Sequence, residues 1–217
     1  MKKIMLLVLC LAVLTSACGI AEETDGFSPR TYAVDAAQAS VVRVVARDRT
    51  VEVSASPDQQ IHISCHESEK EFYQIDVSEG VLTVELVQNK QWYDFIGGKS
   101  ADAYRVIEIQ IPDGAVDTLE IQTTNENVTL APLSLLEGAY IDVNGGDIRF
   151  DSLSVASTLR LETKNGSVVG TIRDLVDAFT IKTEIKKGDS NLPEQMGDGE
   201  KTLEVCVNNG DIEISFI

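Results

Sequence analysis

The sequence predicts an all-β fold whose second half is a β-solenoid, a β-helix-like stack of coils of 20–22 residues, after an irregular β N-terminal half. Three observations carry this prediction: β-branched runs that alternate with polar residues, turns of Asn, Gly and Asp between them, and a pattern that repeats at a fixed spacing. One coil of about 20 residues cannot bury a core alone. Stacked coils can, with strands ~4.8 Å apart in parallel register.

The first residues have the pattern of a secretion signal. Lys2 and Lys3 form a positive n-region, and residues 4–14 are an almost wholly apolar run of eleven residues. A membrane-spanning helix needs about 20 residues, whereas a signal-peptide h-region has this shorter length. We therefore expect residues 1–17 to be a signal peptide.

The predicted signal ends at a cysteine. The segment Leu14-Thr15-Ser16-Ala17-Cys18 resembles a bacterial lipobox, which implies lipidation of Cys18 by acyl chains such as palmitate and cleavage before it. Thr15 stands where the consensus prefers Leu, so an ordinary signal peptide with an unmodified Cys18 is the alternative. Two or more acyl chains anchor a protein stably. We therefore expect an extracytoplasmic lipoprotein whose partner is the membrane, through the lipid on Cys18.

The chain is strongly acidic, with a net charge of −17. Removing residues 1–17 takes away Lys2 and Lys3 and no acid, so the mature charge is −19. This balance excludes nucleic acid as a partner, because phosphate binding needs a basic patch. Like charges on stacked copies repel each other, so we expect a monomer.

The mature chain divides into a tether and one domain. Residues 18–30 carry Gly, Glu, Asp, Ser and Pro and are expected to form a flexible tether, followed by a single β domain over residues 31–217. Within this domain, residues 31–114 predict irregular strands and an aromatic and Gly-rich loop over 88–103. The expected strands of this half are residues 41–45, 50–55, 60–66, 72–77, 81–87 and 105–111.

Residues 115–217 repeat a strand, a turn and a second short strand. The second strands begin at Val128, Ile148, Val168, Ser190 and Ile212, at spacings of 20, 20, 22 and 22. Coils stacked in sequence order place one column of residues inside and another outside. The inner column is Ile121, Ile141, Leu161 and Ile181, and the outer column is Gln122, Asp142, Glu162, Lys182 and Glu204.

The repeats TTNENVTL, VNGGDIRF, TKNGSVVG and VNNGDIEI and the segment VSEGVLTVELVQ resemble the bacterial putative-adhesin family. This is a domain-of-unknown-function family of β-solenoid envelope proteins. The resemblance covers about residues 35–217. It implies a stacked-strand fold outside the cell and brings no catalytic residues. The adhesin label alone does not establish adhesion, because a fold does not determine function.

Two cysteines remain in the mature domain. Cys65 shares the strand face of Ile61 and Ile63 and is expected in the core, whereas Cys206 lies opposite Leu203 and Val205 and is expected outside. Their compartment permits disulfides. A Cys65–Cys206 bond needs close Cα atoms and converging side chains, and the sequence leaves it open.

The sequence lacks a convincing catalytic constellation. The only histidines, His62 and His66, lie about 13 Å apart on an extended strand, at ~3.3 Å per residue, and cannot share a metal ion. A nucleophile elbow and a phosphate-binding Gly loop are both absent from the sequence. We expect no cofactor.

Carboxylates are the one source of chemistry. Asp142 and Glu162 are expected as neighbours on adjacent coils, where two like charges raise a pKa or recruit a cation. Lys182, one coil further on, compensates them. We interpret the row as a solvated ladder and expect no metal site, with Asp142 and Glu162 as the weak candidates.

The densest aromatic group lies in the 88–103 loop. Trp92, Tyr93 and Phe95 are candidate binding residues, because loops on a rigid scaffold often carry binding. The interpretation that we favour is a hydrophobic plug over the open end of the solenoid, since solenoid ends need covering.

These observations predict a lipid-anchored envelope or cell-surface β-solenoid that acts through binding or structure and is not catalytic. Its partner would be a protein or a polysaccharide. The alternative is a polysaccharide-cleaving β-helix enzyme that uses outward carboxylates.

Overall fold

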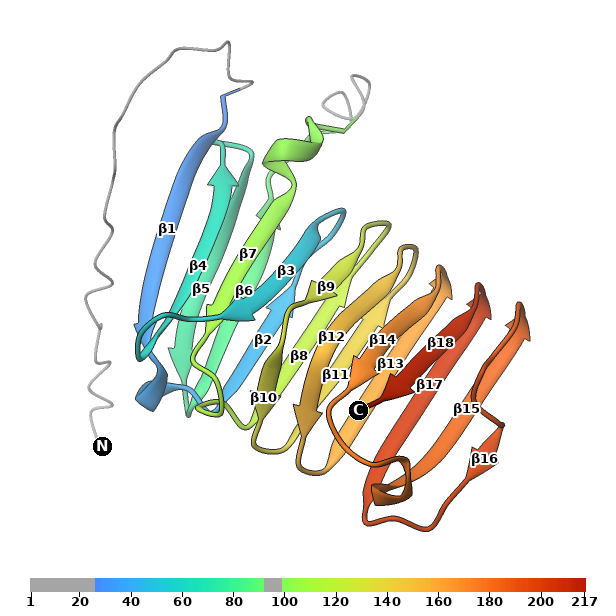
Figure 1. The fold of residues 1–217 in the computed structure, drawn as a ribbon. Helices are drawn as coiled ribbons and strands as arrows, with labels where there is room; N and C mark the ends of the chain where they lie inside the picture. The colour runs from blue at the N-terminus through green and yellow to red at the C-terminus, as the bar shows by residue number, and fades with distance from the viewer. Residues whose placement is uncertain (1–25, 92–98) are drawn as a thin grey trace, which may run out of the picture.

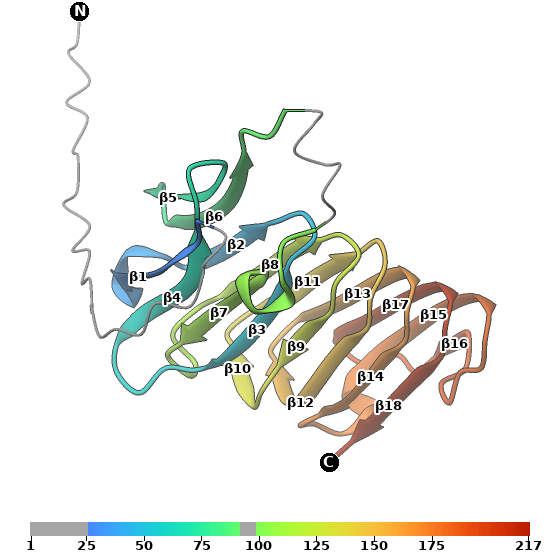
Figure 2. The ribbon, with the colours of Figure 1, turned by 90° about the horizontal axis from the view of Figure 1, so that it is seen from above.

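Strands with alternating apolar residues build two facing sheets around one continuous core. The computed structural model describes residues 26–91 and 99–217. The predicted all-β, solenoid-like fold is confirmed, and the strands are stacked from the N-terminal end of the domain to the C-terminal end (Figures 1 and 2). Within these described residues, the elements outside the sheets are the short 3-10 turns η1 (Ala36–Gln38), η3 (Asp102–Tyr104) and η4 (Val176–Ala178).

Each sheet has nine strands. In spatial order, sheet A contains β1 (Ser28–Asp35), β4 (Gln60–Glu67), β7 (Val106–Ile111), β3 (Thr50–Ala55), β9 (Val128–Leu130), β12 (Ile148–Val155), β14 (Val168–Ile172) and β18 (Ile212–Phe216), with β10 (Leu133–Leu135) also paired to β12. Sheet B contains β16 (Gln195–Met196), β15 (Phe179–Lys187), β17 (Lys201–Asn209), β13 (Thr158–Asn165), β11 (Gly138–Val143), β8 (Thr118–Thr123), β2 (Val41–Val45), β6 (Val81–Gln88) and β5 (Glu71–Ser78).

The coils are stacked in parallel register, as the repeat predicts. Ile121, Ile141 and Leu161 are Cα partners on adjacent strands, and all three are buried. The outward neighbours on the same strands are polar. Because the side-chain period of a strand is two residues, this register puts one apolar row of every coil into the core.

The order of the last two coils differs from the expected order. β17 lies between β13 and β15, so the final repeat of the sequence is inserted before the fourth. Ile181 therefore pairs with Leu203 and lies in the row of Leu159 rather than in that of Leu161. Lys182 and Glu204 likewise lie one row away from Asp142 and Glu162. The row of Asp142 and Glu162 continues instead through Cys206 and Glu184.

The composition of the two repeats explains this order. An inner coil must present apolar residues from both of its strands, and the fifth repeat does so with Val205 in β17 and Ile212 in β18, both fully buried. After β15 the fourth repeat continues with polar residues and forms no second strand in sheet A, where Ser190 makes an isolated bridge to Ile212. It is therefore suited to the end of the stack.

The N-terminal half is more regular than the sequence suggests. β2 and β3 form a coil in parallel register with β8 and β9, and β6 and β7 form another coil outside it. At this end of the stack, β1 pairs antiparallel with β4, β4 with β7, and β5 with β6. The tether expected over residues 18–30 ends earlier, because the buried Phe27 stacks on Tyr104 and β1 begins at Ser28.

The outer edge of β18 is covered by the fourth repeat. Asn191 donates a side-chain hydrogen bond to the carbonyl of Ile214 and accepts one from its N–H. The cover comes from residues 190–192, which follow β15.

We predict that Ile141→Asp unfolds the domain. Ile141 is buried, and an unpaired charge in the core costs several kcal/mol, on the order of the stability of a whole domain. Asp142→Ala, on the outer face of the same strand, should change the free energy of unfolding by less than about 0.5 kcal/mol. Urea unfolding followed by circular dichroism measures the free energy of unfolding of both variants. If both variants lost a comparable amount of stability, the assignment of Ile141 to the inner face and Asp142 to the outer face would be wrong.

We also predict that deleting residues 201–217 destabilises the whole domain and causes aggregation, because β13 and β15 lose the strand that lies between them. Size-exclusion chromatography and thermal melting measure the effect. Deletion of Ile217 alone, which is 67% exposed, is the control and should melt like the full chain. A soluble truncated chain with an unchanged melting temperature would show that the last coil is dispensable.

Candidate functional site

The outer face of sheet B carries two adjacent rows of side chains, most of them charged or polar. They come from β2, β8, β11, β13, β17 and β15, and each member is the Cα partner of the next. One row is Arg43, Glu120, Tyr140, Arg160, Glu204 and Lys182, and the other is Val45, Gln122, Asp142, Glu162, Cys206 and Glu184.

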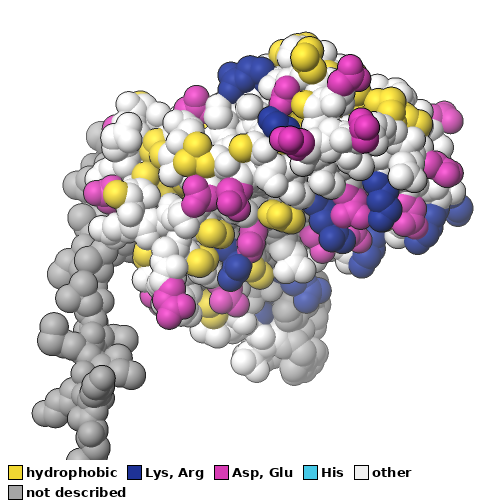
Figure 3. All heavy atoms as spheres, turned by 90° about the horizontal axis from the view of Figure 1, so that it is seen from below, with side chains coloured by type: hydrophobic (Ala, Val, Ile, Leu, Met, Phe, Trp, Pro, Cys, Tyr) yellow, Lys and Arg dark blue, Asp and Glu magenta, His cyan; other side chains and the backbone are white. Residues whose placement is uncertain are grey.

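Opposite charges alternate along the first row. Arg43 Nε donates to Glu120 Oε2 over 2.6 Å. Arg160 lies 3.8 Å from Glu162 and 3.6 Å from Glu204, measured between guanidinium nitrogens and carboxylate oxygens. Exposed ion pairs of this kind add little stability, so their main effect is to orient the side chains. Acidic and basic side chains also lie intermixed toward the C-terminal end of the stack (Figure 3).

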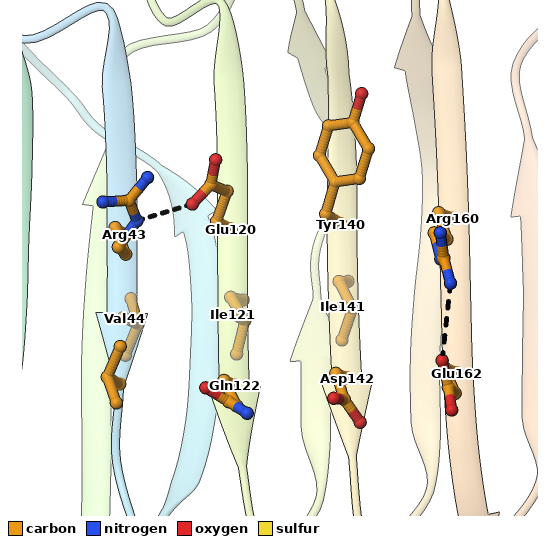
Figure 4. A pocket seen from close by; sticks show the side chains of 11 residues that line it. Arg43, Val44, Glu120, Ile121, Gln122, Tyr140, Ile141, Asp142, Arg160 and Glu162 are labelled. Carbon is orange, nitrogen blue, oxygen red and sulfur yellow. Dashed lines mark hydrogen bonds and ion pairs between the residues drawn. The ribbon is translucent and has the colours of Figure 1, made fainter.

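A groove of about 470 Å³ lies over β2, β8, β11 and β13. Tyr140 stands in its middle with 42% of its surface exposed, between Glu120 on one side and Arg160 on the other (Figure 4). Asp142 lines the same groove, and its carboxylate has no ion pair or hydrogen bond among the residues that the structure describes. The groove therefore combines an exposed aromatic ring, two oriented ion pairs and one free carboxylate.

The groove continues in both directions over the outer face. A hollow of about 240 Å³ around Cys206 shares Arg160 and Glu162 with it, and another of about 460 Å³ shares Gln122 and Asp142. We call the groove and these two hollows the sheet B track. It crosses the strands rather than running along one of them.

The structure places the predicted carboxylates as neighbours, because Asp142 and Glu162 are Cα partners. The compensating cation is Arg160, which pairs with Glu162, rather than Lys182. Within residues 26–91 and 99–217, no group of three or more His, Cys, Asp or Glu side chains could hold a metal ion.

The two described cysteines are free and lie in different sheets. Cys65 is buried in β4, and burial raises the pKa of its thiol to about 12. Cys206 points outward from β17. Partial burial, followed by the nearby carboxylates of Glu184 and Glu162, also raises its pKa. Both thiols are protonated at neutral pH, which makes them poor nucleophiles.

Sequence reasoning missed a ladder of side-chain hydrogen bonds along the turns. In each pair, a side-chain oxygen on one coil accepts from the backbone N–H of the equivalent residue on the next. The pairs are Asn127 to Asp147 (2.8 Å), Asp147 to Ser167 (2.8 Å), Ser167 to Asp211 (3.0 Å) and Asp211 to Asp189 (2.9 Å). The recurrence of Asn, Asp or Ser at the repeat spacing is the signal that could have revealed it.

Glycine permits the close approach of these turns. Gly166 and Gly210 have φ of +159° and +147°, and a Cβ on either would lie 2.0 Å from the carbonyl oxygen of a stacked glycine. Only glycine fits at these positions.

Trp92, Tyr93 and Phe95 lie outside the described residues, as does Cys18. The described residues on both sides of 92–98 are held by ion pairs. Lys90 pairs with Glu71, which also pairs with Arg49 in a buried cluster. On the other side, Lys99 lies 3.1 Å from both Asp48 and Glu126.

Comparisons with known proteins agree with this fold. The Toastrack DUF4097 family matches residues 42–217. A putative cell adhesion protein from Clostridium sporogenes is 15% identical with a TM-score of 0.62, and the alignment covers 88% of this chain and 100% of that one. A putative adhesin from Bacteroides fragilis is 13% identical with a TM-score of 0.44, over 89% and 98% of the two chains. Comparison with curated proteins gives no match.

The described residues contain no helix long and apolar enough to cross a membrane. The likeness to the clostridial protein supports the fold alone, because the two sequences are only 15% identical.

We predict that Glu71→Gln destabilises the domain by about 3–5 kcal/mol at neutral pH, because Arg49 is left without a buried carboxylate partner. Burial raises the pKa of Glu71, but Lys90 and Arg49 outweigh burial, and the net effect is a lowered pKa. A lowered folded-state pKa stabilises the protein above the unfolded value of about 4.3. That stability is lost as the pH falls through the folded value.

The free energy of unfolding of the wild-type chain should therefore fall more steeply below about pH 4.3 than that of Glu71→Gln. Denaturant unfolding at several pH values measures this difference. Glu213→Gln, on the exposed face of β18, is the control and should follow the wild type. Parallel pH profiles for wild type and Glu71→Gln would contradict the role of the buried pair.

Proposed function

The chain belongs to the Toastrack DUF4097 family, and we propose that it is a lipid-anchored envelope protein that acts by binding through the outer face of sheet B. In this proposal, the lipid on Cys18 holds the domain outside the cytoplasm. The sheet B track is the contact surface. The protein works without catalysis.

The N-terminal pattern supports the anchor. The positive n-region, the apolar run and the lipobox-like segment before Cys18 together resemble the signal of a bacterial lipoprotein. Eight residues separate Cys18 from Phe27, where the described fold begins. At an upper limit of ~3.5 Å per residue they reach about 30 Å, so the proposed lipid would keep the domain close to the membrane surface.

The observation that carries the binding role is the exposed ring of Tyr140 between two oriented ion pairs. An aromatic ring left half uncovered in a polar face is a recurring feature of binding surfaces. The ion pairs of Arg43 and Arg160 orient their side chains before any ligand arrives, which lowers the entropy cost of binding.

The same geometry argues against the polysaccharide-cleaving alternative. Most such enzymes use two carboxyl groups that flank the bond to be cleaved, one of them as a general acid. Here Asp142 and Glu162 lie side by side on adjacent strands, and Arg160 pairs with Glu162. Trp92, Tyr93 and Phe95, which lie outside the described residues, stay candidates for binding or for a plug over the end of the solenoid.

We predict that Cys18→Ala releases the protein from the membrane or leaves an uncleaved precursor. Without the thiol, acyl chains cannot be attached, and their burial supplies the anchoring energy. Cell fractionation and the mass of the mature N-terminus measure both outcomes. Cys206→Ala is the matched control and should stay in the membrane fraction. Normal processing and membrane association of Cys18→Ala would refute the anchor.

The binding role is tested with detergent-washed envelope material from the producing cells. The wild-type chain should be retained, Tyr140→Ala and Arg160→Ala should be retained less, and Glu213→Ala on the other sheet should match the wild type. Release of new reducing ends, measured in parallel, should stay at background. Equal retention of all variants would contradict the sheet B surface, and reducing ends that disappear with Asp142→Asn would favour the enzyme.

A further inference from the structure

We infer that the sheet B track binds an uncharged linear glycan laid across the strands, with a sugar ring stacked on Tyr140. This inference rests on the proposed binding function and names the class of its ligand. It follows from the direction of the track, the state of the backbone beneath it, its side-chain chemistry and its charge.

The direction of the track favours a polymer that crosses the strands. From β2 to β15 the outer face spans six strands, or about 24 Å at ~4.8 Å per spacing. Such a polymer would contact one side chain of each row on every strand that it crosses. A sugar unit in an extended chain is closer to this spacing than an amino-acid residue, which advances ~3.4 Å in a strand.

The backbone beneath the track argues against a peptide. Peptides add to sheets at an edge, where free N–H and C=O groups pair with them. β8, β11, β13 and β17 are interior strands that are paired on both sides. Their outer face therefore offers side chains and no backbone groups to a ligand.

The side chains match the two kinds of surface on a sugar. The apolar C–H face of a sugar ring stacks on an aromatic ring, and Tyr140 presents one with a hydroxyl that has no partner among the described residues. The guanidinium groups of Arg43 and Arg160 and the amide of Gln122 are planar groups with more than one hydrogen-bonding atom, suited to adjacent hydroxyls.

The charge of the protein favours an uncharged polymer over an anionic one. Five cations line the sheet B track against five carboxylates: Arg43, Arg47, Arg160, Lys164 and Lys182 against Glu120, Asp142, Glu162, Glu184 and Glu204. The track therefore offers a polyanion no net attraction, and the charge of −17 on the whole chain repels it. Arg43 and Arg160 are already paired with carboxylates, so an uncharged glycan binds without breaking either pair.

The test measures calorimetric binding of the purified full chain to two neutral hexasaccharides, β1,4-linked glucose and β1,4-linked N-acetylglucosamine. The matching disaccharides and an oligogalacturonate hexamer are the comparison ligands. We expect at least one neutral hexamer to bind, and its disaccharide and the anionic hexamer to bind at least about tenfold more weakly. The disaccharide spans only part of the track, and the anionic hexamer meets like charge.

Variants identify the site. Tyr140→Ala should weaken binding of the hexamer by about tenfold, the upper range for one lost aromatic stack, whereas Tyr140→Phe should keep most of it. Glu213→Ala, on the outer face of sheet A, is the control and should bind like the wild type. Tyr140 is exposed, so its replacement should leave the melting temperature unchanged.

The ligand class is wrong if neither neutral hexamer binds, if the anionic hexamer binds best, or if a disaccharide binds as well as its hexamer. Equal binding by wild type and Tyr140→Ala would overturn the site. If these outcomes occur while envelope material is still retained in a Tyr140-dependent way, the ligand is of another class and the proposed function stands. If that retention is also lost, the proposed function fails with it.

Discussion

The structure depends on the in-register parallel pairing of successive coils. A slip of one residue would turn every inner row toward solvent. The turns oppose such a slip, because the side chains of Asn127, Asp147 and Ser167 each bind the backbone of the next coil. The same register aligns Glu120, Tyr140 and Arg160 on the outer face. The parallel pairing of the coils therefore produces both the core and the candidate binding surface.

Most of the local structure could be predicted from the sequence. Alternation predicted that Ile141 is buried beside an exposed Asp142, and that Cys65 lies in the core while Cys206 lies outside. The order of the coils could not be predicted. Similar repeats indicate the structure of one coil, but they do not indicate which coils are neighbours in the stack. β17 pairs with β13 and with β15, and the repeat pattern alone does not predict this order.

The candidate site was partly predictable for the same reason. The repeat spacing made Asp142 and Glu162 neighbours, and the identical spacing two residues earlier relates Glu120, Tyr140 and Arg160. That second row was not recognised, because a charged residue on an exposed strand face carries no local signal of binding. Arg43 could not be placed at all, since its position depends on the pairing of β2 with β8.

The insertion of β17 between β13 and β15 has a consequence for the order in which the domain is assembled. Synthesis delivers β15 before β17, yet β15 reaches its final neighbour only when β17 is in place. Contacts that wait for distant parts of the chain form slowly. The N-terminal coils can therefore close while the chain is still being made, and the C-terminal end of the stack is completed only after β17 and β18 have been added.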